Sequence, residues 1–504
     1  MTQHIVVGAG ASGCILARRL VDAGRQVLLI EAGEMHRHPS NVEDVEGFIN
    51  LWNTRFDWAL PTVRQKGLAN RTITVNQGKI VGGSSAINAM MYVRCHSSDY
   101  EHLERRGGPR WSLDRTRRAL SRIENYVDGP REGRFQSGLM EVRDCPDPAS
   151  YSPEFQQSAA ALGYAADDWD YNGPRQENGA GPLQFNIDGQ GRRHSAFNAY
   201  LAEILDTPLL EVRHGCEALR IVLGPDGGAT GVDVRNSQGE IETLRSEQEI
   251  ILCGGALLTP LLLQRSGIGP TRTLEKAGVP PKVELPAVGE HLMDHLQLPV
   301  IYRLKKEIPN PRLLTGNVLF LNLNNNSPSG APDLQLNFTP AAPRPLQRLL
   351  PPLGGPVMIF LPILVQPVSV GRVRLGAKQR VELDPHYLSH RKDVEVLIKA
   401  VEFCRQMVKQ PGLEGLAGEP LLPEDADLEG YVRGNASTLW HPVGTCRLGS
   451  DPEESVVDSR LQVHGIANLH VADASVTPYA TAGNNHVPTM VIAEMAAELL
   501  LSGD

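Results

Sequence analysis

The sequence has few of the features that mark secreted, disulfide-bonded, metal-binding or membrane-spanning proteins. It contains seven cysteines and no CxxC pair. An odd, dispersed set of this kind is typical of reduced thiols and disfavours a disulfide framework or a zinc site. The longest apolar run near the middle, VMIFLPILV, is too short to cross a bilayer and contains Pro362. These patterns predict a protein without a membrane span.

The chain also lacks an excess of positive charge and the composition of a secretory leader. Its 49 basic and 58 acidic residues leave a net charge of -9, which favours solubility and indicates no nucleic-acid partner. The segment HIVVGAGASG comes so early that no room remains for the charged and apolar regions of a signal peptide. We therefore expect a cytoplasmic protein of 504 residues, long enough for two closely packed domains.

A glycine-rich turn near the N-terminus predicts a dinucleotide site. The stretch HIVVGAGASGCILARRLVDAGRQVLLIEAG has the pattern of a strand, a glycine turn, a helix and a second strand. Gly8, Gly10 and Gly13 form GxGxxG, whose glycines permit a tight turn, the approach of a pyrophosphate and close helix–strand packing. Phosphates would lie at the helix N-terminus, and Glu31, at the end of the second strand, would accept hydrogen bonds from ribose. This motif alone leaves open which dinucleotide is bound.

Strand and helix patterns of this nucleotide-binding type recur along the chain and are interrupted by an antiparallel block. Alternating segments between about residues 300 and 385 predict an antiparallel sheet with one solvent-exposed face. We expect an α/β protein, α+β overall, in which a Rossmann-like domain carries an inserted antiparallel-sheet substrate domain. The predicted boundaries are 1–155, 211–296 and 450–504 for the dinucleotide-binding domain, and 156–210 and 297–449 for the substrate-binding domain.

Two further glycine-rich stretches narrow the choice of cofactor. The first, NQGKIVGGSSAINAMMYVR (residues 76–94), places two glycines and two serines in a loop that can lie against a flat ligand. The second, GGALLTPLLLQRSGIGP (residues 254–270), predicts a glycine turn and a short helix that begins at Thr259-Pro260 and ends at Ser266-Gly267. Together with VGEHLMDH and NLHVADASVTP, these stretches resemble the glucose-methanol-choline (GMC) oxidoreductases, which bind FAD.

The resemblance extends from residue 4 to about residue 500 and implies the fold of that family. It also implies which residues hold FAD: Gly8, Gly10, Ala11, Ser12, Gly13, Glu31, Ala32, Val81, Gly82, Gly83, Ser84, Asn88, Ala89, Met90, Asp473, Ala474, Val487 and Pro488. Choline-oxidase-like relatives attach the flavin covalently through a histidine two places after the two serines. This chain has Ile87 there, so the resemblance implies non-covalent FAD. Cys95 departs from the small residue usual after YVR, without affecting a cofactor contact that the family pattern names.

Two histidines far apart in the sequence match the active-site positions of the family. His441 lies in STLWHPVGTC, and His486 lies in AGNNHVPTMVIAEMAA. Alcohol oxidation removes a hydroxyl proton while a hydride leaves the same carbon, and a neutral imidazole has a suitable proton affinity near pH 7. We expect His441 to act as general base and His486 as its partner, with the division of roles open. Trp440 matches a substrate-pocket position, although core packing explains an aromatic residue there almost as well.

The resemblance implies FAD-dependent oxidation of a primary alcohol to its aldehyde, with oxygen or a quinone-type acceptor reoxidising the flavin. The Trp440-His441 pair is similar to that of bacterial oxidases of aromatic and furanic alcohols, which favours such a substrate. Alternatives are hydroxynitrile-lyase-type acid/base chemistry on the same scaffold and a polyol- or choline-type dehydrogenase. An NAD-dependent dehydrogenase would explain the GxGxxG turn but neither longer signature.

Overall fold

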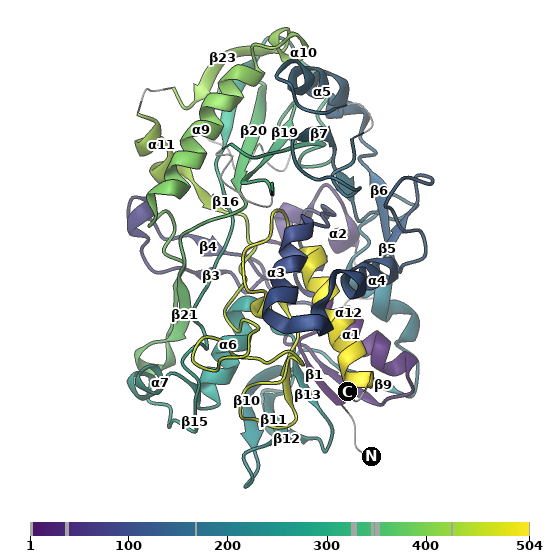
Figure 1. The fold of residues 1–504 in the computed structure, drawn as a ribbon, viewed down its shortest axis with the longest axis vertical. Coiled ribbons are helices and arrows are strands. Elements are labelled where there is room, and N and C mark those ends of the chain that lie inside the picture. The colour runs from purple at the N-terminus through teal and green to yellow at the C-terminus, as the bar shows by residue number, and fades with distance from the viewer. Residues whose placement is uncertain are drawn as a thin grey trace.

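The molecule is elongated and carries a parallel sheet towards one end and an antiparallel sheet towards the other (Figure 1). The computed structural model describes residues 4–35, 40–166, 169–323, 330–343, 347, 353–424 and 427–502. Pro362, the proline of the longest apolar run, lies inside a strand of the antiparallel sheet. The α/β class expected from the sequence is confirmed.

The parallel sheet lies in the first of these two regions. Its strands, in spatial order, are β25 (Leu469–Val471), β13 (Ile250–Leu252), β1 (His4–Val7), β2 (Val27–Ile30) and β9 (Leu210–Arg213). Every neighbouring pair in this order is parallel. β1, β2, β13 and β25 are buried along their whole length, which explains why their sequences are nearly continuous runs of aliphatic residues.

Two helices from opposite ends of the chain pack together on this sheet. α1 (Ala11–Asp22) follows β1, and α12 (His486–Ser502) is the last helix that the structure describes. Figure 1 shows them side by side, in purple and yellow. Arg19 of α1 donates to the fully buried Glu494 of α12, with Nη2 and Oε1 2.7 Å apart. This ion pair is one contact through which the C-terminal helix is held against the N-terminal dinucleotide turn.

Several shorter elements surround the parallel sheet. They are α3 (Ser97–Gly107), α4 (Leu113–Ile123), α6 (Gly255–Arg265), α7 (Thr271–Ala277), β10 (Glu217–Leu223), β11 (Ala229–Arg235) and β12 (Ile241–Arg245). β10 pairs with β11 and β11 with β12, both antiparallel. Small sheets join β3 (Leu60–Pro61) to β4 (Thr74–Val75), β14 (Ile268–Gly269) to β15 (Val283–Glu284), and β5 (Glu124–Tyr126) through β6 (Met140–Asp144) to β8 (Gln184–Phe185).

The antiparallel sheet forms the other region. Its main path, within the described residues, is β23 (Ala417–Leu422), β17 (Val300–Leu304), β20 (Val357–Leu364), β19 (Leu334–Thr339), β18 (Asn317–Leu321) and β7 (Gly179–Pro182). β16 (Leu296–Gln297) pairs with β20 and with β24 (Ser437–Thr438). The helices near it are α5 (Ser152–Ala161), α9 (Arg391–Met407), α10 (Pro411–Glu414) and α11 (Leu428–Asn435). The division into two domains remains a prediction. These strand pairings show which residues form each of the two sheets.

The prediction that one face of this sheet is exposed to solvent is wrong for its central strands. β18 and β19 are buried at every position. Leu336 and Phe338 of β19 pack in one core with residues of α9, while the alternate residues Gln335 and Asn337 face the opposite way. Asn337 lines a cavity, and both polar side chains are buried within the molecule. β21 (Arg372–Leu375) and β22 (Val381–Asp384), from the same block of sequence, form a separate hairpin.

The helix in the second glycine-rich stretch begins earlier than predicted. α6 starts at Gly255, so Pro260 lies inside the helix and not at its start. A proline has no N–H to donate to the carbonyl of the residue four places earlier, here Ala256. The hydroxyl of Thr445 donates to that carbonyl instead, with an O–O distance of 2.5 Å. A distant side chain therefore replaces the missing hydrogen bond and lets the helix extend.

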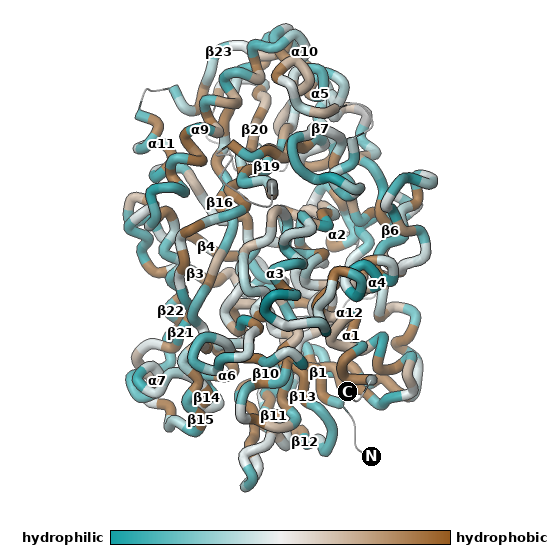
Figure 2. The backbone as a smooth tube through the Cα atoms, viewed as in Figure 1, coloured by the Kyte–Doolittle hydropathy of each residue, from teal (hydrophilic) through white to brown (hydrophobic). Residues whose placement is uncertain are grey.

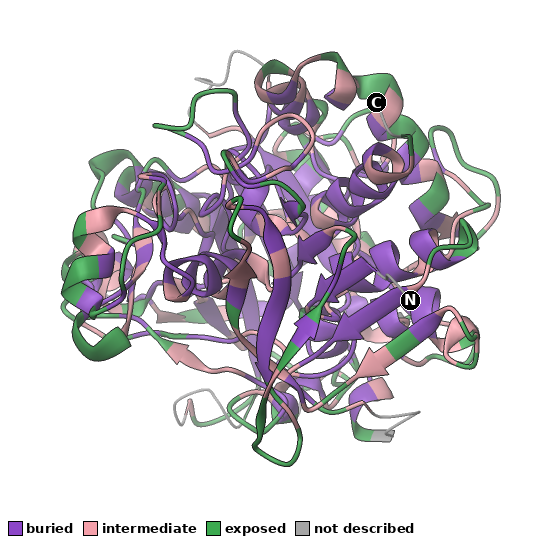
Figure 3. Ribbon diagram, turned by 90° about the horizontal axis from the view of Figure 1, so that it is seen from below, coloured by how far each residue is buried: buried purple, intermediate pink, exposed green. Residues whose placement is uncertain are grey.

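The hydrophobic segments lie inside the molecule. Figure 2 shows brown, hydrophobic segments along β1, β13 and β20, and Figure 3 shows exposed residues mainly in outer loops and on outer helix faces. All seven cysteines are unpaired, as the sequence predicted. None of the helices among the described residues is both long and apolar enough to cross a membrane.

Candidate active site

A cavity of about 860 Å³ connects the two sheets. At one end it is lined by Val7, Ile30 and Cys253, which stand at or just beyond the carboxyl ends of parallel strands. At the other end it is lined by residues of the antiparallel sheet, among them Asn337 and Leu361. Open α/β sheets bind ligands at the carboxyl ends of their strands, and this volume is in the range of cofactor and ligand sites.

The GxGxxG turn has the geometry that its pattern predicts. Gly8 has a φ of +103°, a conformation that favours glycine. A Cβ atom on Gly13 would lie 1.9 Å from the carbonyl oxygen of Gly8, so the third glycine permits close contact between helix and turn. Gly10 differs, because a Cβ there would meet nothing nearer than the Cys253 carbonyl oxygen at 4.0 Å. Gly10 lines the cavity and leaves its backbone open to a ligand.

The start of α1 suits an anionic ligand. Gly10 is the N-cap and supplies no side-chain hydrogen bond to the first turn, which also contains no acidic residue. The backbone N–H groups of the first turn of α1 and the helix dipole therefore favour a phosphate at this position. Ser12 lines the cavity, and its hydroxyl is buried without a hydrogen-bond partner among the described residues. These features fit the diphosphate of a dinucleotide.

Two buried carboxylates frame this end of the cavity. Glu31 accepts hydrogen bonds from the backbone N–H groups of Ala9 and Gly33, at 2.9 and 2.8 Å, and burial raises its pKa to about 7. Asp473 accepts from the backbone N–H of Gly255 at 2.8 Å and from the hydroxyl of Thr259 at 2.6 Å. Asp473 thus holds the start of α6 in the cavity wall, while Glu31 lies where a ribose would follow the diphosphate.

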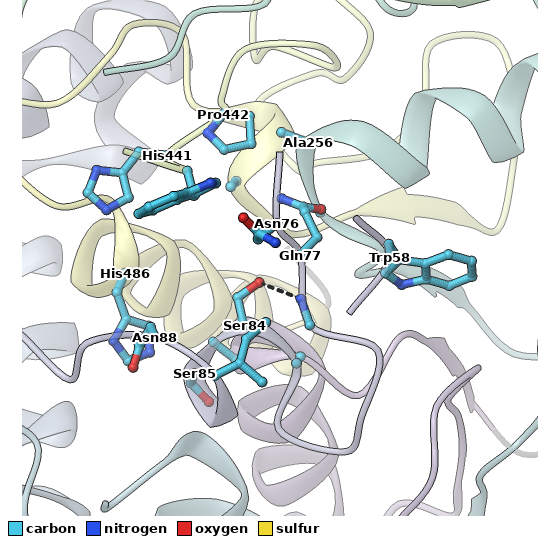
Figure 4. Close-up of a pocket in the computed structure, with 18 of the residues that line it drawn as sticks. Trp58, Asn76, Gln77, Ser84, Ser85, Asn88, Ala256, His441, Pro442 and His486 are labelled. Carbon is cyan, nitrogen blue, oxygen red and sulfur yellow. Dashed lines mark hydrogen bonds between the residues drawn. The ribbon is translucent and has the colours of Figure 1, made fainter. Parts of the chain in front are cut away.

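The first glycine-rich signature folds directly over the dinucleotide turn. The N–H of Gly82 donates to the carbonyl of Ala9 at 2.7 Å, and a Cβ on Gly83 would lie 2.6 Å from the Cα of Gly10. The loop is braced by the buried Arg193, which donates to the carbonyl of Ser85 at 3.1 Å and to Asn88 Oδ1 at 2.8 Å. Figure 4 shows Ser84, Ser85 and Asn88 around the pocket. The loop is therefore held in the cavity wall by contacts on both sides.

His441 lies in the cavity wall with both ring nitrogens in polar contact. Its Nδ1 is 3.0 Å from Nδ1 of His295, and its Nε2 is 3.3 Å from Nδ2 of Asn484. Its backbone N–H donates to Asp294 Oδ1 at 2.8 Å. Burial, reinforced by the nearby His295 and His486, lowers the pKa of His441 well below its ordinary value of 6.5. The imidazole is therefore neutral near pH 7 and able to accept a proton.

His486 is brought to the same side of the pocket by the start of α12. Figure 4 shows the two histidines on one side, with Asn88 next to His486. Neither ring nitrogen of His486 has a hydrogen-bond partner among the described residues. Burial and the charge of Arg193 lower its pKa to about 4. His486 lines the cavity, and its neutral imidazole has hydrogen-bonding groups that no described side chain uses.

The turn before His441 holds Trp440 in an unusual conformation. Trp440 has a φ of +62°, which is rare for a bulky side chain and requires support from its surroundings. The backbone N–H of Trp440 donates to the hydroxyl of Thr438 at 2.7 Å, and that hydroxyl donates to Asp294 Oδ2 at 2.5 Å. The Trp440 ring contacts Trp52, with centroids 4.5 Å apart. Asp294 therefore sets the position of both the aromatic pair and the histidine.

The wall around this aromatic pair carries no charged side chain among the described lining residues from 297 to 442. These residues are Gln297, Pro299, Leu314, Asn337, Ile359, Leu361, Val381, Asn435, Ser437, Leu439, Trp440, His441 and Pro442. The charged residues that line the cavity elsewhere are Glu31, Glu217, Arg265 and Asp473, all from the part built on the parallel sheet. The cavity therefore has one charged half and one neutral, partly aromatic half.

Most residues expected at the site line this single cavity. They are Gly8, Gly10, Ala11, Ser12, Glu31, Ala32, Gly83, Ser84, Asn88, Ala89, Met90, Trp440, His441, Asp473, Ala474 and His486. Gly13, Val81 and Gly82 stand behind the wall, and Val487 and Pro488 are buried in the first turn of α12 without lining the cavity. Ile87, two places after the paired serines, does line it.

Four residues that contact the aromatic pair or His441 were not singled out from the sequence. They are Trp52, Asp294, His295 and Asn484. Asp294 and His295 end the matched stretch VGEHLMDH, and Asn484 stands two places before His486, so both motifs contained a signal. Trp52 lies in a segment without a motif, and only its position in space identifies it.

Comparisons with known proteins agree with this arrangement. Two family models described as GMC oxidoreductase match residues 2–297 and 367–493. An alcohol dehydrogenase [acceptor] of Pseudomonas putida is 32% identical, and the match covers 99% of this chain and 96% of the relative. An oxygen-dependent choline dehydrogenase of Vibrio vulnificus is also 32% identical, over 99% and 95% of the two chains.

Solved structures share the fold over the whole chain. Pyridoxine 4-oxidase from Mesorbium loti matches with a TM-score of 0.91 and 30% identity over 99% of each chain. A fungal aryl-alcohol oxidase, 22% identical over 100% of this chain and 99% of that one, matches with a TM-score of 0.85 and shows the fold alone. Because the family models span most of the sequence and these relatives cover it nearly end to end, the chain belongs to the GMC oxidoreductases, FAD-dependent enzymes that act on CH–OH groups.

Proposed function

We propose that this enzyme oxidises a neutral aromatic primary alcohol to its aldehyde, with His441 as the general base. The observation that carries the proposal is that His441 and His486, both neutral, border one cavity with the dinucleotide turn and an uncharged aromatic wall. Bound FAD supplies the acceptor for the hydride that leaves the carbinol carbon. The protein's own residues bind the alcohol, orient it and remove its hydroxyl proton.

His441 is suited to proton removal by its position and its protonation state. Its Nε2 faces Asn484 at 3.3 Å, a long contact that an alcohol hydroxyl can replace. Burial keeps the ring neutral, so Nε2 can accept the proton as the hydride departs. His486, whose ring nitrogens are unpaired and whose position is the start of α12, would orient the hydroxyl and stabilise developing negative charge on its oxygen. The positive end of the helix dipole acts in the same direction.

The neutral half of the cavity supports an aromatic substrate. Trp52 and Trp440 offer ring faces, while Gln297 and Asn337 offer amide groups to a ring substituent. Pyridoxine 4-oxidase, the 30% identical structure, is named for a substituted heteroaromatic alcohol. A quaternary ammonium such as choline would find no carboxylate in this wall among the described residues, although several relatives are named choline dehydrogenases. We therefore propose aryl or furanic carbinols in preference to choline.

The pH dependence of kcat/KM should report the lowered pKa of His441. The base must be neutral, so kcat/KM rises with pH as the imidazolium loses its proton and becomes level above that pKa. Because burial lowers this pKa well below 6.5, the rising limb should lie below pH 6.5 and the profile should be level near pH 7. Steady-state kinetics between about pH 4.5 and 9 check this. A rising limb centred above pH 6.5 would contradict a buried, neutral His441.

Anaerobic flavin bleaching should distinguish aromatic from other alcohols. Benzylic and furanic alcohols should reduce the flavin faster than choline or aliphatic alcohols of similar size. Trp52→Leu should lower the rate for aryl alcohols by roughly 2- to 10-fold, the worth of one aromatic contact, with little effect on aliphatic ones. Because Trp52 also donates to the carbonyl of Ile87 at 3.1 Å, Trp52→Phe is the matched control, which keeps a ring and removes that donor. Equal losses for both substrate classes in Trp52→Leu would argue against an aromatic subsite.

Admission of air and acid precipitation identify the electron acceptor and the mode of flavin attachment. Admission of air after bleaching should restore the flavin spectrum in an oxidase, whereas a dehydrogenase will need a quinone-type acceptor. Acid precipitation should release the yellow cofactor, since Ile87 has no nucleophile for a covalent bond.

A location in the cytoplasm remains a proposal, supported by the seven unpaired cysteines.

A further inference from the structure

We infer that His295 is a positioning residue that fixes the tautomer of His441 and so keeps Nε2 of the base unprotonated. The inference rests on the proposed role of His441. The two imidazoles meet edge to face, with ring planes 89° apart, centroids 5.2 Å apart and their Nδ1 atoms 3.0 Å apart. A hydrogen bond between two neutral imidazoles holds a single proton, so one Nδ1 donates and the other accepts. Which of them donates decides whether His441 can act as a base at Nε2.

The contacts of Nε2 on His441 favour an unprotonated atom there. Asn484 is oriented by Gln335, whose Nε2 donates to Asn484 Oδ1 at 3.3 Å and to Asn337 Oδ1 at 3.0 Å. With its oxygen engaged in this way, Asn484 presents its NH₂ group to His441. An NH₂ group donates, so Nε2 of His441 accepts. The proton of the neutral His441 ring must then be on Nδ1.

The surroundings of His295 are compatible with this arrangement. His295 is 1% exposed, and burial lowers its pKa to about 4, so its ring is neutral. Nδ1 lies 3.0 Å from Nδ1 of His441, and Nε2 has no hydrogen-bond partner among the described residues. Nδ1 of His295 then accepts from Nδ1–H of His441, whose proton is placed there by the contact of its Nε2 with Asn484.

The arrangement has a direct consequence for the reaction. When His441 takes the hydroxyl proton on Nε2, both of its nitrogens carry protons and the ring becomes positive. The Nδ1–H···Nδ1 bond to His295 then becomes charge-assisted and stronger, which stabilises the protonated base. The opposite tautomer would place a proton on Nε2 of His441, where it could not accept another. His295 thus favours the reactive form of His441 without touching substrate.

Neighbouring contacts hold the two rings in this relation. Asp294, the residue before His295, accepts the backbone N–H of His441 at 2.8 Å and the hydroxyls of Thr438 and Tyr387, each at 2.5 Å. One short segment therefore carries both the anchor for the His441 backbone and the acceptor for its ring. Rigid support of this kind is what preserves the orientation of a catalytic side chain.

The test combines a direct measurement of the tautomer with two variants. In the FAD-bound enzyme labelled with ¹⁵N-histidine, ring correlation spectra should show His441 protonated at Nδ1 and unprotonated at Nε2, its signals being assigned by their loss in His441→Gln. His295→Leu removes the acceptor at similar volume and should slow anaerobic flavin reduction on the order of 100-fold or more, as when the orienting partner of a catalytic histidine is lost. His295→Asn places an amide oxygen near the original Nδ1 and should recover most of that rate.

The outcomes are separable from failure of the proposed function. A His441 ring protonated at Nε2 in the neutral enzyme overturns the inference, whatever the variants do. A folded, FAD-bound His295→Leu protein that reduces its flavin at the wild-type rate also overturns it, as does an equal loss in both variants with the tautomer unchanged. If His441→Gln reduces flavin normally, the base assignment itself fails, and the tautomer spectrum still reports on His295.

Discussion

Replacing His441 by glutamine should leave FAD bound and slow flavin reduction by the substrate about 10²- to 10⁴-fold, the usual contribution of a general base. The amide of glutamine can form a hydrogen bond but does not take up a proton near pH 7, so the hydroxyl proton would have no acceptor as the hydride leaves. Stopped-flow absorbance under anaerobic conditions measures this step directly. The flavin spectrum and FAD content verify that the cofactor site is intact.

An exposed histidine provides the matched control for this substitution. His214→Gln changes the same side-chain chemistry outside the cavity and should keep wild-type rates. The His441→Gln profile should also lose the limb of kcat/KM that lies below pH 6.5. Flavin reduction at the wild-type rate in His441→Gln would exclude His441 as the base and leave His486 as the candidate.

Gly13→Ala should have the largest effect on folding and cofactor retention. A Cβ at this position would lie 1.9 Å from the carbonyl oxygen of Gly8. Because that oxygen belongs to the backbone, no flexible side chain can move aside to make room. Forcing α1 away from the turn should cost about 1–3 kcal/mol or more, as overpacked cores do. We expect a clear fall in the thermal unfolding temperature, measured by circular dichroism on the FAD-free protein, and loss of bound FAD.

Gly10→Ala should separate cofactor binding from folding at the same turn. An added Cβ there meets no atom closer than 4.0 Å, so the unfolding temperature of the FAD-free protein should barely change. The methyl group would enter the cavity where a pyrophosphate approaches the backbone, so the Kd for FAD should rise. Gly415→Ala, with no atom within 4 Å of the added Cβ, is the neutral control. Similar unfolding temperatures for Gly13→Ala and the control would show that close helix packing is not needed here.

Local patterns predicted the dinucleotide half of the molecule well. The strand, turn and helix of residues 4–22 follow from continuous aliphatic runs, glycine spacing and helical periodicity, all of which act over a few residues. The antiparallel half was predicted less well, because alternation in β19 indicates two kinds of face but not what covers them. The polar residues Gln335 and Asn337 predicted a solvent-exposed face, but both side chains are buried.

The sequence by itself determined the family and the cofactor class and indicated the two candidate histidines, because these depend on short motifs whose residues are close in the chain. Only the tertiary structure decided which groups act on those histidines. His295 and His441 are 146 residues apart in sequence, yet their Nδ1 atoms are 3.0 Å apart in space. The paired residues Trp52 and Trp440 are even farther apart in the sequence. Periodicity and spacing describe neighbours along the chain. Contacts that depend on how two sheets close around a cavity are set by packing, which no local pattern contains.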